Sequence, residues 1–476
     1  MPAFKLLGFA PDADPTTPGV LVECEGLIPT DRGMVTAPNP VAGLTVTTSL
    51  PSNAASVAYF EPSGEGVLYA YVPGSGNELF RLYGTTGWDD VGRSGGYSGA
   101  QMSMAQFGPS VVLAVTGAGA NLLQAQTLYS ASFADVSGAP TANLVVTANR
   151  FVMLLGHTDP GSTSNYVPDG WYCAARDSHT DWSPSVSTLC GFGRVPGVSA
   201  WTAAIEFGDS IYAWTRTGMY RGDFVGASEG IWRFVKLPHR VGCLNMAAVT
   251  KTDRAIIFLS SDNLYLFDGA TLIGLMDGAC RQWFSERYSP FSGADATHVR
   301  YDRRRGCIWV AFPDGGGGLF VLVYHIASGR WGRGAENVFR TYVEAPAGLA
   351  PGNQPTVLAW KITGHQVFSL AGGYETGASP KCTTWDFGDD SANVEITDSR
   401  LRFVTAPPTT TCRPYTRKSL GEALTAGSIV TRTSEGKFEL RQAAPSAQWH
   451  RHVYTFNGHA EVTHLWLPVK NAGDRK

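Results

Sequence analysis

Residues 67–83 read VLYAYVPGSGNELFRLY, in which a glycine-rich turn separates two apolar runs. The runs Val67–Val72 and Glu78–Tyr83 are rich in β-branched and aromatic residues, and PGSGN between them supplies residues that favour turns. This order of residues is typical of a β-hairpin. A lone hairpin cannot bury its apolar face, so this unit requires neighbours of the same kind.

The same pair of runs recurs along the chain. Turns such as GAGAN, SDN and PDGGGG follow the first runs, and second runs such as MYRGDF and LFVLVYH come next. In the third copy the turn is stretched into HTDPGSTSNYVPDG before the second run, WYCAAR. The first runs begin, at intervals of 40 to 59 residues, at Val67, Val111, Phe151, Ser210, Ala255, Cys307 and Thr356.

A further aromatic residue closes six of the units, and it has its own period. At intervals of 45 to 51 residues the chain carries Trp88, Phe133, Trp182, Trp232, Trp283 and Trp331. This period falls in the range of four-stranded propeller blades, and radial closure would remove free strand edges. We therefore predict an all-β protein in which residues 51–375 form a β-propeller of six or seven blades. An irregular stacked β-sandwich with accidental spacing is the alternative.

The number of blades is open because the unit that begins at Thr356 lacks the closing aromatic residue. A strand from the N-terminal segment could complete the ring there. That segment, residues 1–50, has seven prolines among its first 40 residues. It should be an extended arm with one or two edge strands, which gains order only by lying on another surface.

Residues 376–476 depart from the repeat. Segments such as RLRFVT, KFELRQ and AEVTHLWLPV alternate apolar and polar residues, as half-buried antiparallel strands do. The exception is RKSLGEALTAG, where Ser419 and Glu422 form a capping box and Gly427 can end a short helix. We predict a separate C-terminal β domain.

Composition and charge bound the function. The chain has 476 residues, 43% hydrophobic and 16% charged, so it can bury a large core. The net charge of −3 predicts neither nucleic acid nor an anionic membrane as an obligatory partner. This small total is the sum of two larger charges of opposite sign. The residues from Arg400 to the end carry a net charge of +7, and the rest of the chain carries −10. Arg300 and Arg303–Arg305 are a local basic exception. Opposite charges favour head-to-tail self-contact or different partners at two ends; unrelated solvated faces are the alternative.

No stretch of about 20 apolar residues occurs, so no membrane-spanning helix is expected. The N-terminal apolar run is too short and too acidic for a signal peptide. The cysteines lie at least 17 residues apart without a CxxC pair, so we predict free, mostly buried thiols in a reducing cytoplasm. They are Cys24, Cys173, Cys190, Cys243, Cys280, Cys307, Cys382 and Cys412.

Two glycine-rich segments imitate nucleotide-binding motifs. In VVLAVTGAGANLL, Gly117 and Gly119 follow a strand, but Leu122 takes the third glycine position and a hairpin partner follows instead of a helix. PDGGGGL, with Gly315–Gly318, lacks the Lys-Ser/Thr of a phosphate-binding loop and is predicted to be a hairpin tip. We therefore expect no cofactor.

Two polar clusters are candidates for metal binding. WDFGDD places Asp386, Asp389 and Asp390 together, which we interpret as a turn, with cation binding as the alternative. In WHRHVYTF, His450 and His452 would share one strand face. We interpret them as ordinary surface or interface histidines.

A zinc site on that strand would need a third ligand. The nearby candidates are His459, Glu461 and His464. No nucleophile elbow and no reactive-cysteine context occurs, and the aspartate-box turns of sialidase-like propellers are absent. We therefore predict no catalytic, cofactor-binding or metal-binding residues, and no enzymatic activity.

The flanks carry a family resemblance. The opening LLGFAPDADPTTPGVLVECEGLIPTDRGMVTAPNP resembles that of the tail nozzle, or tail hub, proteins of short-tailed bacteriophages. So does the ending, from RLRFV through YTRKSLGEALTAGS to SEGKFELRQAAPSAQWHRHVYTFNGHAEVTHLWL. The resemblance runs from end to end, although the blades alone are compatible with many propellers.

The resemblance implies a hexameric ring that is fixed below the portal and adaptor rings of the virion. Its channel would pass the genome during ejection without sequence recognition, and tail fibres, spikes or a needle would dock outside it. The C-terminal β domain and the arm would build a platform. Such a protein would be assembled in the host cytoplasm and would have no catalytic residues.

Two other functions stay open. One is a carbohydrate-binding or glycan-cleaving propeller of the same kind of particle, which release of reducing sugar would favour. The other is a free-standing interaction scaffold of the kelch or WD type. The scaffold would keep its stability and function in the propeller alone, whereas a nozzle would lose assembly without either flank.

Overall fold

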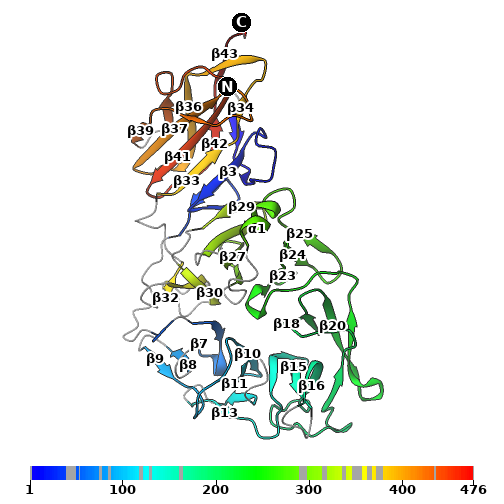
Figure 1. Ribbon diagram of the computed structural model, residues 1–476. Helices are drawn as coiled ribbons and strands as arrows, with labels where there is room; N and C mark the ends of the chain where they lie inside the picture. Colours follow the sequence, from blue (N-terminus) through cyan, green and yellow to red (C-terminus); the bar gives the residue numbers. More distant parts are fainter. Residues whose placement is uncertain are drawn as a thin grey trace.

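The computed structural model consists of a β-propeller and a second all-β unit beside it (Figure 1). It describes the chain except residues 1–2, 39–49, 53, 74–77, 84–86, 117–121, 128–130, 160–164, 289–296, 314–318, 335–338, 346–355, 362–366, 371–378, 434–435 and 475–476.

Five separate blades of the propeller are four-stranded antiparallel sheets, each made of four consecutive strands. The first sheet consists of β6 (Ser56–Phe60), β7 (Val67–Val72), β8 (Glu78–Tyr83) and β9 (Trp88–Asp90). The second consists of β10 (Met102–Phe107), β11 (Val111–Thr116), β12 (Gln124–Gln126) and β13 (Ala134–Asp135). The third is β14 (Ala142–Ala148), β15 (Phe151–Thr158), β16 (Tyr166–Cys173), β17 (Gly191–Arg194). The fourth and fifth are β18 (Ala203–Phe207), β19 (Ser210–Trp214), β20 (Met219–Gly226), β21 (Ile231–Lys236) and β22 (Val249–Lys251), β23 (Ile256–Leu259), β24 (Leu264–Phe267), β25 (Leu272–Gly274).

Two further groups of consecutive strands follow the five sheets. They are β26 (His298–Asp302), β27 (Cys307–Pro313), β28 (Leu319–His325), β29 (Arg330–Arg333), and then β30 (Phe339–Ala345), β31 (Thr356–Lys361), β32 (Val367–Ser369). The first strands of successive groups contact one another in order, and β30 returns to contact β6. The strands therefore surround a common axis (Figure 1).

Short helices are few in the described part of the chain. The α-helix is α1 (Arg281–Arg287), and the 3₁₀ turns include η1 (Pro62–Gly64), η3 (Ala227–Glu229) and η4 (Met246–Ala248). None of the described helices is long and apolar enough to cross a membrane.

The closing aromatic residues do not all close their sheets. Trp88, Trp232 and Trp331 lie in the fourth strands β9, β21 and β29. Phe133 directly precedes β13, and Trp283 lies in α1, which follows the last strand of its unit, β25. Trp182 lies in the loop before β17, so the prediction is wrong for this residue, although its side chain is buried.

The two flanks fold together. We call residues 3–37 and 380–474 the terminal module; both chain ends lie in it, at the end of the molecule away from the propeller (Figure 1). Its N-terminal strands are β1 (Ala3–Lys5), β2 (Gly8–Phe9), β3 (Val20–Glu25), β4 (Leu27–Pro29) and β5 (Met34–Thr36). Its C-terminal strands are β33 (Lys381–Thr384), β34 (Phe387–Gly388), β35 (Ala392–Ile396), β36 (Asp398–Thr405), β37 (Thr409–Arg417), β38 (Thr425–Ala426), β39 (Val430–Thr433), β40 (Lys437–Glu439), β41 (Trp449–Asn457), β42 (Glu461–Trp466) and β43 (Val469–Asp474).

Two sheets that combine strands from both ends of the chain make up most of the terminal module. In one, β3 pairs with β33, and β33 continues through β41 to β37. In the other, β5 and β1 pair with β42, which continues to β36 and β40. The N-terminal arm thus finds its supporting surface on the C-terminal strands of its own chain.

In the part of the chain that the structure describes, one strand pairing joins the terminal module to the propeller. Strand β4 pairs with β29, where Leu27 lies opposite Arg333. An apolar core extends across this seam, from Leu401, Phe438 and Tyr454 of the module to Trp331 of β29. The N-terminal strand therefore extends the sheet of β26–β29, and in the described residues β30–β32 has no fourth strand.

The predicted helix at residues 417–427 is wrong. The segment forms turns that return the chain from β37 to β38, where Thr416 pairs with Thr425. The backbone N–H of Glu422 still donates to the carbonyl of Ser419, at 3.1 Å. So short a helix is marginal in isolation, and here sheet pairing overrides the local capping signal.

All eight cysteines are free and buried, as predicted. Burial raises the pKa of Cys24 to about 11 and that of Cys243 and Cys412 to about 12. A buried thiol with a raised pKa is a poor nucleophile. The cysteines therefore act as small apolar core residues.

Candidate interaction surfaces

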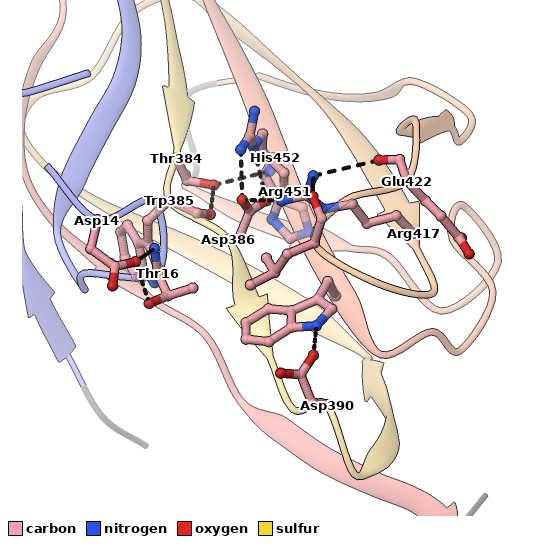
Figure 2. Close-up of polar contacts among 12 residues, drawn as sticks. Asp14, Thr16, Thr384, Trp385, Asp386, Asp390, Arg417, Glu422, Arg451 and His452 are labelled. Atoms are coloured by element: carbon pink, nitrogen blue, oxygen red, sulfur yellow. Dashed lines mark hydrogen bonds and ion pairs between the residues drawn. The ribbon is translucent and has the colours of Figure 1, made fainter. Parts of the chain in front are cut away.

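The WDFGDD segment forms a buried ion cluster (Figure 2). Asp386 is 1% exposed and accepts hydrogen bonds from two arginines, Arg417 at the end of β37 and Arg451 in β41. The Arg417 Nη2 lies 2.5 Å from the Asp386 carboxylate, and the Arg451 Nη2 lies 2.6 Å from it. The backbone N–H of Asp386 donates to the carbonyl of Pro15, at 2.6 Å.

The interpretation of Asp386 as a turn residue is therefore wrong. Asp386 connects three parts of the terminal module, because it contacts Arg417, Arg451 and Pro15. Its neighbours are more local. Asp389 accepts from the N–H of Ser391 at 2.7 Å, and Asp390 accepts from the indole N–H of Trp449 at 2.7 Å. All three carboxylates are thus engaged by the protein itself.

His450 and His452 lie in the core of the terminal module, so their interpretation as surface or interface residues is wrong. His450 is 1% exposed, and its Nε2 lies 2.9 Å from the Val394 carbonyl oxygen. His452 is fully buried, and its Nδ1 lies 3.2 Å from the Tyr454 hydroxyl oxygen. Both rings pack against Phe387.

The other histidines considered for zinc lie elsewhere. His459 contacts the Thr36 hydroxyl through Nδ1 at 2.9 Å, and His464 lies on β42 of the other sheet. In the part of the chain that the structure describes, no three His, Cys, Asp or Glu side chains gather closely enough to hold a metal ion. The two glycine-rich segments, Gly117–Gly119 and Gly315–Gly318, lie outside the described residues.

The buried histidines make stability depend on pH. Burial lowers the pKa of His450 and, more strongly, that of His452, which the charge of His450 lowers further. The unfolded chain binds protons below pH 6.5 while the folded module does not, so acid favours unfolding.

We expect the unfolding free energy to fall below pH 6.5, by up to about 1.4 kcal/mol per pH unit for each histidine. Urea unfolding at pH 7.5, 6.5 and 5.5 measures it. His452→Gln should flatten the profile, and His239→Gln, at a half-buried position in the propeller, should not. Equal slopes in wild type and His452→Gln would contradict this origin.

Polar contacts join neighbouring inner strands around the propeller axis. They include the Glu61 N–H to the Gln106 Oε1 at 3.0 Å, the Thr147 hydroxyl to the Gln106 carbonyl at 2.9 Å, the Asn149 amide to the Asp209 carbonyl at 2.5 Å, Lys251 to Glu206, and Arg303 to Asp253 at 3.0 Å. The ring is therefore closed by polar contacts as well as by apolar packing.

The basic cluster at residues 300–305 belongs to this ring. Arg300 donates to the carbonyls of Ala247 and Tyr342, at 2.7 and 3.0 Å, and so bridges the elements on both sides of β26. Arg305 pairs with Asp302 and donates to the Leu370 carbonyl at 2.6 Å. Burial raises the pKa of the nearby Glu344, on β30, to about 7. These arginines hold blades together rather than forming an open basic patch.

An open basic surface lies on the terminal module instead. We call it the basic face: Lys5 of β1, Arg400 and Arg402 of β36, Lys437 of β40, and Trp466 of β42. The four cations are exposed and lie on the outer side of one sheet. No carboxylate lies within 4.0 Å of any of them in the described residues.

Cations face one another across these strands. Arg400 lies opposite Lys437 on one side and Trp466 on the other, with its guanidinium 6.0 Å from the indole centroid. Arg402 and Lys5 lie opposite His464. The pKa of His464 is lowered mainly by burial and further by the positive charges of Arg402 and Lys5. Like charges directly opposite are destabilising in a sheet, so this face favours a partner that carries negative charge.

Comparison with known proteins identifies no family for this chain. No protein-family model matches the sequence, and no curated protein matches it. Similar solved structures include BBS1N in complex with ARL6DN (10% identity, 70% of this chain and 95% of that chain, TM-score 0.39). Others are BamB from Moraxella catarrhalis (13%, 72% and 92%, 0.38) and a putative 6-phosphogluconolactonase from Bacteroides fragilis (8%, 67% and 90%, 0.40). The strand connectivity defines this chain as a β-propeller with additional sheets from both ends.

Proposed function

We propose that this chain is a non-enzymatic structural subunit of the tail nozzle of a short-tailed bacteriophage. In this proposal six copies form a ring below the adaptor of the virion. Genomic DNA passes through the channel of the ring, and fibres, spikes or a needle dock outside it. The observation that carries the proposal is the terminal module, because the two flanks that bear the family resemblance build it together.

The architecture of the subunit supports this role. A ring subunit must keep a fixed shape while it contacts different neighbours. The β4–β29 pairing and the common core join the module to the propeller. The module carries the basic face, whereas the chain before Arg400 has a net charge of −10. Complementary charges of this kind favour contact between copies or with a separate acidic partner.

We infer further that the propeller has seven blades, within the expected six or seven. The strand groups β26–β29 and β30–β32 follow the five separate sheets, and the cycle of contacts between first strands passes through all of them. A scaffold of the kelch or WD type would need no terminal module. The core shared across the seam favours a propeller that works with its flanks.

The basic face gives the proposal a test on the full chain. Arg400→Glu combined with Arg402→Glu should abolish ring assembly, because the four cations of the basic face become two cations and two carboxylates. Mass photometry measures the assembly state, alone and with the adaptor protein. A matched control is Arg254→Glu, at an exposed turn of the propeller. Rings that form equally well from the double variant would exclude the basic face as an assembly surface.

A further inference from the structure

A cleft lies on the propeller surface, away from the terminal module. It has a volume of about 630 Å³ and opens where the turns of β10–β11 and β14–β15 meet the loop between β16 and β17. Its wall includes Phe107, Asn149, Arg150, Asp177 and His179. The lining residues come from three neighbouring blades, since Glu206 of β18 also lines it, so closure of the ring creates the cleft.

The loop of residues 174–190 is held in place by a buried tryptophan. The Trp182 indole N–H donates to the His179 carbonyl at 2.9 Å, and the Tyr172 hydroxyl donates to the Trp182 carbonyl at 2.5 Å. The two rings also pack edge to face, with centroids 5.4 Å apart. Trp182, which the repeat suggested as the end of a blade, therefore fixes one wall of the cleft.

Aromatic and polar groups meet in the cleft. The rings of Phe107 and His179 lie 6.3 Å apart, and both are half-buried. Burial lowers the pKa of His179, so this ring is neutral at neutral pH. Beside them Arg150 and Asp177 form a two-pronged ion pair, with the Arg150 Nη2 2.5 Å from the carboxylate. The pair uses two of the five guanidinium N–H donors.

The backbone at these residues is held in an uncommon conformation. Asn149, Arg150 and Asp177 have φ angles of 50°, 68° and 64°. Left-handed conformations of this kind are unfavourable for Arg, and they persist where the surrounding contacts determine them. The Asp177 N–H donates to the Arg150 carbonyl at 2.9 Å, which holds the two residues together.

We propose that this cleft binds a neutral saccharide. An aromatic ring beside charged and amide hydrogen-bonding groups suits a sugar, which has apolar C–H faces and many hydroxyls. The lining contains two carboxylates, Asp177 and Glu206, and one guanidinium, that of Arg150. This balance of charge does not favour a phosphate or another anionic ligand. The volume is sufficient for two or three sugar rings, within the usual range of ligand pockets. This site does not depend on ring assembly and requires no bond cleavage.

Saturation-transfer difference NMR on the full chain tests the proposal, with maltotriose, mannotriose and chitotriose as probes. We expect at least one trisaccharide to bind. Asp177→Asn, which tolerates a positive φ but removes the charged pair, should weaken binding at least tenfold, and so should Phe107→Leu. Phe192→Leu is the control, because Phe192 is 47% exposed on β17 and does not line the cleft. Thermal unfolding confirms that each variant is folded.

Two results would overturn the proposal. One is the absence of saturation transfer to all three trisaccharides. The other is binding that persists equally in Asp177→Asn and Phe107→Leu, which would place the sugar elsewhere. Binding of a sulfated heparin tetrasaccharide alone would also contradict it, because that result requires an anion site. A chain that does not assemble into rings should still bind the trisaccharide, so failure of the ring proposal and failure of the saccharide proposal give different results.

Discussion

Asp386→Ala should lower the unfolding free energy of the terminal module by about 3 kcal/mol, because it leaves buried arginine charges without their partner. Asp386 is fully buried as a side chain, whereas Arg417 and Arg451 are 10% and 20% exposed. Removal of one member of a buried ion cluster costs more than the cluster contributes, since the remaining charges stay desolvated. The loss of the Asp386 side chain also frees the segment that contacts Pro15 of the N-terminal arm.

Urea unfolding followed by tryptophan fluorescence measures this change, and hydrogen exchange locates it in β33, β37 and β41. Asp389→Ala is the matched control, because Asp389 is exposed and holds only the Ser391 turn; it should cost about 1 kcal/mol or less. The triple replacement Asp386→Leu, Arg417→Met and Arg451→Leu should recover stability, since it removes every charge of the cluster. An Asp386→Ala protein as stable as Asp389→Ala would contradict the structural role.

Gly332→Val should separate the terminal module from the propeller. Gly332 lies in β29 at the seam, and a Cβ atom there would lie 2.5 Å from the Leu27 carbonyl oxygen and 3.0 Å from the Ile28 Cα. Both are backbone atoms of β4, so the strand must move rather than a side chain. The loss of the β4–β29 pairing would expose the shared core, and we expect a loss of about 3 kcal/mol or more.

Hydrogen exchange at Leu27 and Ile28, together with limited proteolysis of the full chain, measures this separation. Gly421→Val provides the control, because Gly421 is exposed and a Cβ atom there meets nothing within 4 Å. Unchanged exchange in β4 of Gly332→Val would show that the seam does not hold the two parts together.

The sequence predicted the second and third strands of the propeller sheets well. The apolar runs at Val67, Val111 and Thr356 coincide with β7, β11 and β31. Strands β7 and β11 are buried along almost their whole length, so they read as continuous apolar segments. The first strands were missed. MSMAQF and AAIEF mix polar and apolar residues, since part of each strand faces the axis and its polar contacts.

The surfaces could not be predicted from the sequence, because distant segments build them. Lys5 and Arg402 lie opposite the same residue, His464, although almost the whole chain separates them. Asp386 seemed a turn residue because its arginine partners lie 31 and 65 positions away. The histidines of β41 seemed exposed because a second sheet and Phe387 cover them, which local alternation does not reveal.

The central proposal is that this chain is a ring-forming subunit. Mass photometry of the purified full chain, mixed with the adaptor protein of the same phage, tests it most directly. We predict a closed particle that contains six copies of the chain, which should be lost in the Arg400→Glu, Arg402→Glu variant. A wild-type chain that stays monomeric with and without the adaptor would contradict the proposal.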